Sequence, residues 1–150
     1  MKNNEYPNWL VPLYIAKELK EIGFDEPCNH YVRISNDDIK LKINHSSIGW
    51  VILKRNSEYL NDDIASFVTI PTWEQVFAWF RKQGYLYAIE NEICYDFKTR
   101  TQPPKIKYTS YFETVGSGVK LHSCTSESYE EAREELVKDL IYIYSEELLE

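Results

Sequence analysis

The sequence predicts an α+β protein, in which helices pack on one face of an antiparallel sheet. Three segments carry apolar side chains at the spacing of an amphipathic helix, near residues 12–23, 72–84 and 128–144. Between residues 85 and 125, apolar and polar side chains alternate with the period of two that is typical of half-buried strands. Hydrophobic residues make up 43% of the chain and aromatic residues 15%, which indicates a packed core and excludes a disordered chain.

The order of these segments predicts a single domain over residues 1–150. A chain of this length can bury well over half of the surface that it exposes when unfolded. Residues 71–150 give the order helix, strand, strand, strand, helix, and the most economical packing lays both helices on one face of the three strands. We expect residues 1–70 to extend or cover that sheet.

The first two helices have recognisable ends. We expect the first to begin near Pro12, since proline suits a first helical turn, and to end at Gly23, a typical C-terminal cap. The second begins with a capping box, in which the Thr72 hydroxyl accepts the Gln75 backbone N–H and the Gln75 side chain bonds back. Gly84 ends this helix.

Residues 28–70 predict short strands and turns. Three short strands are expected at Tyr31–Ile34, Ile39–Ile43 and Phe67–Ile70. The continuous apolar run Trp50–Leu53 predicts a more buried strand, and Asn61–Asp63 predicts a turn.

Three longer strands follow, at Tyr85–Phe97, Lys105–Val115 and Val119–Thr125. The first has one buried face, formed by every second residue: Tyr85, Tyr87, Ile89, Ile93, Tyr95 and Phe97. The connection 116–118 predicts a hairpin turn, because its two glycines supply positive φ angles at little cost. The segment 99–104 predicts a loop, because its two prolines prevent regular pairing.

The last helix carries the net charge of the whole chain. It begins with a second capping box, Ser128–Glu131, and its buried stripe is formed by Tyr129, Ala132, Leu136, Val137, Leu140, Ile141 and Tyr144. The formal charge is −7, and residues 127–150 hold nine acids against two bases, whereas residues 1–126 are neutral. One interpretation is a solvated outer face. The functional hypothesis is a protein-binding surface that imitates nucleic-acid phosphates, formed by Glu130, Glu131, Glu134 and Glu135.

A basic strip precedes this helix and predicts an alternative site. It consists of Lys98, Arg100, Lys105, Lys107, Tyr111 and Lys120. Single-strand nucleic-acid binders combine such cations with stacking aromatic rings. The favoured interpretation is a solvated hairpin whose lysines pair across strands with Glu90 and Glu92. The strip could instead meet the acidic helix of a second copy and give a homo-oligomer.

The order of residues 71–150 resembles that of double-stranded-RNA-binding domains. In that family the start of the last helix carries lysines that contact phosphates. Here this position holds Glu130, Glu131, Glu134 and Glu135, which would repel a polyanion, so we expect that binding mode to be absent.

Three phrases resemble a family of small uncharacterised proteins that bacteriophages and prophages of gut bacteria encode. The phrases are residues 15–28, residues 71–81, and residues 129–133 with Leu136 and Leu140. The family has no assigned activity, so the resemblance transfers no catalytic residue. It implies a protein that works in the cytoplasm of a bacterial host.

The cysteines and the N-terminus also predict a cytoplasmic protein. No stretch approaches the ~18–20 apolar residues of a membrane span, and the first residues lack a signal peptide's apolar run. Three cysteines cannot all pair within one chain, which indicates reduced thiols. On paper, Cys28-x-His30 and His122-x-Cys124 form a Cys₂His₂ zinc set, but zinc ligands usually have two or more residues between them, so we predict no metal.

Catalytic motifs are absent from the sequence. Asp37-Asp38 and Asp62-Asp63 could collect Mg²⁺, but each pair lies in a predicted turn, where aspartate caps the backbone. Cys94 or Cys124 with His122 could form a nucleophile and its base, without a motif that orders them.

We therefore expect a non-enzymatic interaction protein of a phage or prophage, which binds a bacterial host or defence protein and needs no cofactor. The alternatives are a nucleic-acid-associated protein that uses the basic strip, and a small metal-dependent nuclease or hydrolase.

Overall fold

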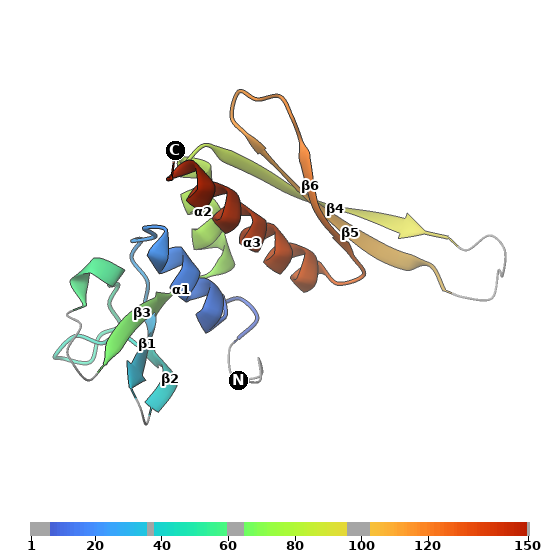
Figure 1. The fold of residues 1–150 in the computed structure, drawn as a ribbon. Helices are drawn as coiled ribbons and strands as arrows, with labels where there is room; N and C mark the ends of the chain where they lie inside the picture. The colour runs from blue at the N-terminus through green and yellow to red at the C-terminus, as the bar shows by residue number, and fades with distance from the viewer. Residues whose placement is uncertain (1–6, 36–37, 60–64, 96–102, 150) are drawn as a thin grey trace. The chain divides into compact units, whose positions relative to one another are not determined.

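In the part of the chain that the structure describes, there are three α-helices and six strands, which confirms the α+β class (Figure 1). The computed structural model describes residues 7–35, 38–59, 65–95 and 103–149. In chain order the elements are α1 (Leu13–Glu21), β1 (His30–Ser35), β2 (Asp38–Ile43), η2 (Asn56–Glu58), β3 (Ser66–Ile70), α2 (Trp73–Lys82), β4 (Tyr85–Cys94), β5 (Lys105–Thr114), β6 (Leu121–Ser126) and α3 (Tyr129–Glu147). The contacts divide the chain into two compact units, Met1–Trp79 and Phe80–Glu150, and we call them the first and the second unit.

The first unit contains an antiparallel sheet in the order β2-β1-β3, with α1 against β3 (Figure 1). The register gives this sheet two different faces. Its apolar face carries buried Val32, Val68 and Ile70, together with the isoleucines and leucine of β2. Its opposite, cationic face carries Arg33, Lys40, Lys42, Tyr31 and Phe67.

The predicted ends of α1 and α2 are confirmed. The N-cap of α1 is Pro12, and Gly23 follows the helix with a φ of +92°, which glycine adopts without strain. At α2, Gln75 N–H donates to the Thr72 hydroxyl at 3.1 Å, and Thr72 N–H donates to the Gln75 side chain at 2.9 Å. Both halves of this capping box are therefore formed.

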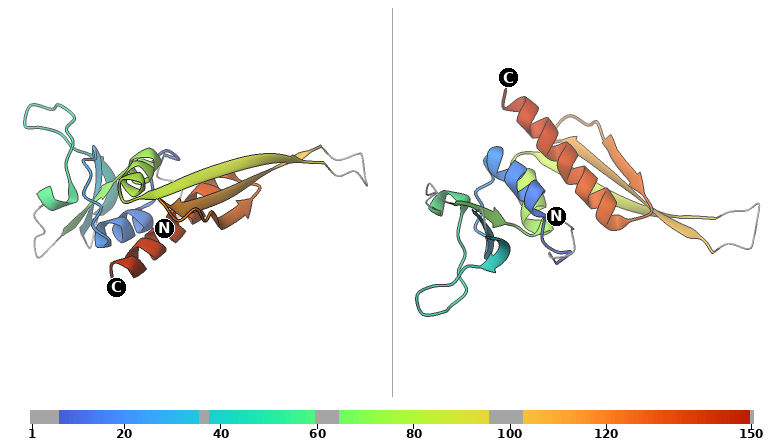
Figure 2. Two further views of the ribbon diagram at one scale, coloured as in Figure 1. Left: turned by 90° about the horizontal axis from the view of Figure 1, so that it is seen from above. Right: turned by 60° about the horizontal axis from the view of Figure 1, so that its bottom comes forward.

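The second unit contains a second antiparallel sheet, in the order β4-β5-β6, with α3 across one face (Figures 1 and 2). The side of α3 that faces the sheet is buried and consists of Ala132, Leu136, Val137, Leu140 and Ile141. On the sheet, Ser110 and Phe112 are buried beneath it. The middle of the predicted apolar stripe is therefore confirmed, whereas Tyr129 at its start is 41% exposed and Tyr144 is half-buried.

Two predictions about these sheets need correction. Residues 1–70 were expected to extend or cover the second sheet, and the described strands do not extend it, because β1, β2 and β3 pair with each other in a sheet of their own. The predicted face of the strand at Tyr85–Phe97 is not buried throughout. The β4 and β5 arms continue past α3 (Figure 1), so Ile93 and its partner Ile106 are exposed.

The second capping box is only half formed. Glu131 N–H donates to the Ser128 hydroxyl at 3.2 Å, as predicted. The Glu131 carboxylate, however, accepts from the Ser126 hydroxyl, and Ser126 Oγ accepts the Ser128 N–H at 3.0 Å. A nearby serine thus takes the place of the carboxylate as the acceptor for Ser128 N–H.

Some sequence predictions fall partly or wholly outside the described residues. These are the turn at 61–63, the end of the strand at 96–97 and residues 99–102 of the predicted loop. The described helices include none that combines the length and the apolar character needed to cross a membrane.

Candidate functional site

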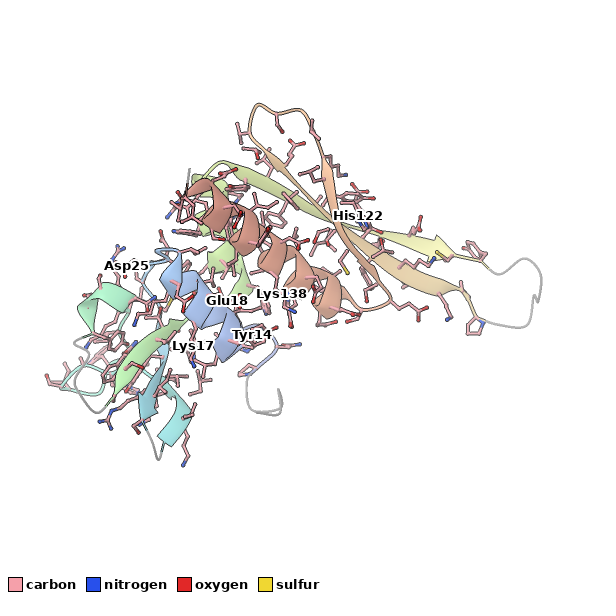
Figure 3. The ribbon with its side chains drawn as sticks, in the orientation of Figure 1. Tyr14, Lys17, Glu18, Asp25, His122 and Lys138 are labelled. Atoms are coloured by element: carbon pink, nitrogen blue, oxygen red, sulfur yellow. The ribbon has the colours of Figure 1, made fainter. Side chains whose placement is uncertain are left out.

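The glutamates of α3 make polar contacts within the second unit. Lys138 (Figure 3) donates to Glu135 at 2.7 Å and pairs with Glu134 at 3.5 Å. These carboxylates raise the pKa of the Lys138 ammonium. Glu131 accepts from Ser126, and Glu130 accepts from the Ser128 hydroxyl at 3.3 Å.

Two other acids of α3 have hydrogen-bond partners in the sheet. Asp139 accepts from the Ser123 hydroxyl of β6 at 2.6 Å, and Glu147 accepts from the buried Tyr85 hydroxyl of β4. Part of the acidic charge of α3 therefore holds this helix on its own sheet. Glu130 and Glu131 stay exposed, whereas Glu134 and Glu135 are half-buried.

The described part of the basic strip is largely neutralised by carboxylates. Lys105 pairs with Glu127 at 3.0 Å, and Lys120 pairs with Glu90. The hydrogen bond to Glu90 raises the pKa of Lys120. Lys107 lies opposite Glu92 in the register of β4 and β5.

These contacts agree with the interpretation of a solvated hairpin, whose lysines face carboxylates. Lys120 Nζ also lies 4.1 Å from the centre of the Tyr111 ring, and this contact occupies one face of that ring. Lys98 and Arg100 lie outside the described residues.

The two Cys/His pairs belong to different units. Cys28 and His30 belong to the first unit, His122 and Cys124 to the second. His122 (Figure 3) lies opposite Tyr111, whereas Cys124 lies opposite Ser110, with a register shift between them. Because Tyr111 and Ser110 are adjacent on β5, His122 and Cys124 point to opposite faces of the sheet. The prediction that this pair shares one face was wrong.

The first Cys/His pair lies in an apolar setting. Cys28 is fully buried, and burial raises the pKa of its thiol to about 12. His30 packs edge-on against Trp9, with ring centres 5.2 Å apart, and burial lowers the pKa of its imidazole. Both residues behave as core side chains.

The side chains of the two carboxylate pairs lie outside what the structure describes. Asp37, Asp62 and Asp63 lie outside the described residues, and of Asp38 only the backbone in β2 is described. Over the ranges that the structure describes, no three His, Cys, Asp or Glu residues are grouped closely enough to hold a metal ion.

The most distinctive surface is a hairpin that contains Trp50–Leu53, the run that the sequence predicted to be a more buried strand. Its apolar side chains face solvent, with exposed fractions of 78% for Ile48, 71% for Trp50, 56% for Val51 and 60% for Leu53. We call residues 44–54 the apolar hairpin. The turn is closed by backbone bonds between Ser46 and Trp50 at 2.8 Å and between Gly49 and Ser46 at 3.0 Å. Figure 2 shows this segment projecting from the first sheet after β2.

The base of the apolar hairpin is anchored in the first unit. Asn44 is buried, and its side-chain amide donates to the Cys28 carbonyl at 3.2 Å. The Tyr59 hydroxyl donates to the Asn44 side chain, and Lys54 exchanges two backbone bonds of 2.8 Å with Cys28. Burial raises the pKa of Tyr59 to about 12, so this hydroxyl keeps its proton. The exposed apolar residues are therefore presented from a fixed base.

Aromatic rings support this base on the cationic face of the first sheet. Tyr59 stacks on Phe67 with ring centres 5.2 Å apart and planes 9° apart, and Tyr31 lies 5.4 Å from Tyr59. Lys54 Nζ lies 5.4 Å from the centre of the Tyr59 ring. The half-buried rings thus place a cation at the foot of the hairpin.

The segment that contains the apolar hairpin is rich in bases, and acids lie at its foot: Glu58 accepts the Arg55 N–H at 2.6 Å, and Asp25 accepts the Ser57 N–H at 2.8 Å. Residues 39–55 contain four bases (Lys40, Lys42, Lys54 and Arg55) and no acid. Lys40 lies directly opposite Arg33 in the register of β1 and β2. Like charges in directly opposed positions destabilise a strand pair, which makes this arrangement costly unless an anion is nearby.

The described surface also has open recesses, of which two are considered. One, of about 440 Å³, lies in the first unit and is lined by Lys17, Lys20, Glu21, Ile34, Ser66 and Val68. Its Lys20 ammonium already donates to the Phe67 carbonyl at 2.6 Å. The other, of about 250 Å³, lies in the second unit and is lined by Leu86, Tyr87, Ala88, Tyr111, Glu113 and Lys120. Neither encloses a set of catalytic groups.

Sequence reasoning missed the apolar hairpin because an apolar run indicates burial without saying what covers it. The available signal was the composition of residues 44–50. Asn44, His45, two serines and Gly49 favour a turn, and a turn is seldom buried.

Comparison with known proteins gave no relative. No family model, no curated protein and no solved structure matches this chain.

Proposed function

We propose that this chain is a non-enzymatic protein that acts by binding another protein. The observation that carries the proposal is the apolar hairpin. We further propose, from the resemblance of its three helical phrases to phage proteins, that the chain is phage- or prophage-encoded. Its partner is then a protein of the bacterial host or of the host's defence system.

Exposed apolar surface supports this function on energetic grounds. Burying a Val, Leu or Ile side chain stabilises a protein or a complex by roughly 1.5–3 kcal/mol. This chain leaves four large apolar side chains exposed within one short segment: Ile48, Trp50, Val51 and Leu53. Contiguous exposed apolar residues, unlike scattered ones, mark sites of interaction. Exposed tryptophan is the residue type that contributes most often to the centre of protein interfaces.

The anchored base adds a second argument. A hairpin that is already ordered loses little conformational entropy when it binds. The contacts of Asn44 with Cys28 and Tyr59 supply that order before any partner arrives.

We propose a secondary surface in the first half of α3, formed by Glu130, Glu131, Glu134 and Glu135. Glu130 and Glu131 are exposed at the start of the helix, where a basic partner could reach them. They already accept hydrogen bonds from serines, so a partner would have to replace those bonds. For this reason we assign the main binding surface to the apolar hairpin.

The alternative functions gain less support from the described residues. Lys105 forms an ion pair with Glu127, and Lys120 forms one with Glu90. These pairs reduce the positive charge that is available to a nucleic acid, which weakens the case for binding through the basic strip. A metal-dependent nuclease would need carboxylates from several strands around one ion. The described residues bring no such group together.

Site-specific photocrosslinking tests the proposal. A benzophenone amino acid replaces Trp50 in one variant and Glu74, an exposed residue of α2, in the control. Irradiation in a lysate of a gut bacterium should yield a discrete crosslinked protein from position 50 and not from position 74. That protein is then purified, and its binding to the wild-type chain and to the Trp50→Ala variant is measured.

We expect Trp50→Ala to weaken binding about 30-fold, because a central tryptophan commonly contributes about 2 kcal/mol. The thermal unfolding midpoint should stay unchanged, since the side chain is exposed. The matched variant Glu130→Gln/Glu131→Gln should change affinity less than threefold. Unchanged affinity of Trp50→Ala, or dependence on the glutamates alone, would move the binding surface to α3. Failure to crosslink any protein from position 50 would contradict the proposal.

A further inference from the structure

The first sheet has an open edge next to the apolar hairpin. In the order β2-β1-β3, β2 is a terminal strand, and in the described ranges only β1 pairs with it. A terminal strand presents unpaired backbone N–H and C=O groups, to which an extended segment of another protein can add as a new strand.

The two sides of β2 differ in chemistry, which restricts what can add to it. Ile39, Leu41 and Ile43 point to the apolar face, and Ile39 and Ile43 are exposed because α1 contacts β3 at the far edge. Lys40 and Lys42 point to the cationic face. Directly opposed residues of paired strands share a face. A complementary strand therefore alternates apolar residues with acidic ones.

The apolar hairpin continues this pattern beyond the end of β2. Asn44 N–H donates to the Asn29 carbonyl at 2.8 Å, so the pairing runs past Ile43. His45 and its bridge partner Val51 then lie on the face of Ile43. The edge and the hairpin thus form one continuous surface, apolar on one side and cationic on the other.

The charges disfavour self-pairing of two β2 strands in the register centred on Leu41. An antiparallel pairing of two β2 strands centred on Leu41 would place Lys40 directly opposite Lys42 of the other copy. Two such like-charge pairs are destabilising, and lysine on an edge strand is a common guard against self-pairing. The Lys40 ammonium attracts an acidic strand. The Arg33–Lys40 pair gives a further reason, because an added carboxylate would relieve its repulsion.

We propose that β2 binds an extended segment of another protein, in which acidic and apolar residues alternate, by strand addition to its free edge. This inference rests on the proposed function and names the chemistry of the partner. The acidic side chains of the segment lie against Lys40 and Lys42, and its apolar side chains lie beside Ile39 and Ile43. Trp50 and its neighbours cover the end of the segment.

Synthetic peptides test strand addition without knowledge of the natural partner. The probe is a capped hexapeptide that alternates valine and glutamate. One control peptide replaces its glutamates with lysines, and a second replaces its central valine with proline, which removes a backbone donor. Binding to the full chain is followed by NMR shifts of backbone amides at low salt.

We expect the valine–glutamate peptide to shift the amides of β2 and of the apolar hairpin. The lysine peptide should not bind, and the proline peptide should bind at least fivefold more weakly. Lys40→Glu should weaken binding about tenfold and should admit the lysine peptide in its place. Raising the salt concentration from 50 to 300 mM should also weaken binding, since exposed charges are screened.

Three outcomes would overturn strand addition. The first is the absence of β2 shifts at millimolar peptide. The second is equal binding of the proline peptide. The third is Trp50-dependent sedimentation of the chain with phosphatidylglycerol vesicles in place of peptide binding, which would assign the surface to a lipid. The crosslinking experiment at position 50 is independent of these results. A protein partner found there, together with the absence of β2 shifts, would contradict strand addition and leave the proposed function in place.

Discussion

Cys28 differs from the other two cysteines in its surroundings, and this difference predicts its reactivity. Its thiol is fully buried, and burial raises its pKa to about 12. Only the thiolate is nucleophilic, so at pH 8 a thiol with this pKa reacts on the order of 1,000-fold more slowly than an ordinary one near 8.5. Iodoacetamide labelling followed by mass spectrometry should modify Cys94 first and Cys28 only in the unfolded chain.

Cys124 provides the internal comparison for this prediction. Burial raises the pKa of its thiol, and the carboxylates of Glu131, Glu135 and Asp139 raise it further. It is half-exposed, so we expect a labelling rate between those of Cys94 and Cys28. Rapid labelling of Cys28 in the folded chain would show that this core opens readily.

Ser128 stabilises α3 as an N-cap, which gives a prediction at the scale of one element. Its hydroxyl accepts the Glu131 N–H, one of the backbone donors that a helix leaves unpaired at its start. Ser128→Ala should lower the free energy of unfolding by about 1 kcal/mol, measured by urea denaturation. The control is Ser145→Ala in the last turns of α3, where the hydroxyl donates to the Tyr142 carbonyl at 2.7 Å. Equal losses in both variants would contradict a capping role.

The elements that could be predicted from the sequence are those with local signals. The capping box of α2 depends on residues 72–75 alone, and the strands at β1, β2 and β3 follow from short alternating runs. The misplaced elements depend on distant partners. The run Trp50–Leu53 is apolar, but nothing in the described residues covers it. The spacing of His122 and Cys124 predicts that both side chains lie on one face of the strand. The register shift beside Tyr111 places them on opposite faces.

Sheet membership, which belongs to the whole molecule, was also beyond the sequence. Strand pairing depends on which chain segments meet, and alternation within a strand does not encode its neighbour. The candidate site could not be predicted from the sequence for the same reason. The net charge marked α3 as the candidate site, although its acids bond to Lys138, Ser123 and Tyr85. In the apolar hairpin, the run Trp50–Leu53 indicated burial, whereas the turn residues of 44–50 indicated exposure.

The boundary between the two units lies inside α2, which bears on the prediction that residues 1–150 form one domain. Trp79 packs against Phe24 in the first unit, whereas Phe80 packs against Tyr85 in the second. Ala78→Pro removes a helical hydrogen bond and clashes with the preceding turn, at a cost of about 3 kcal/mol or more. If the chain unfolds as one domain, amide exchange should accelerate in both β1 and β5, because one continuous helix supplies side chains to both units. Ala78→Gly, which costs about 1 kcal/mol, should produce the same pattern to a smaller degree. Acceleration confined to a single sheet would show instead that the two units are independent domains joined by α2.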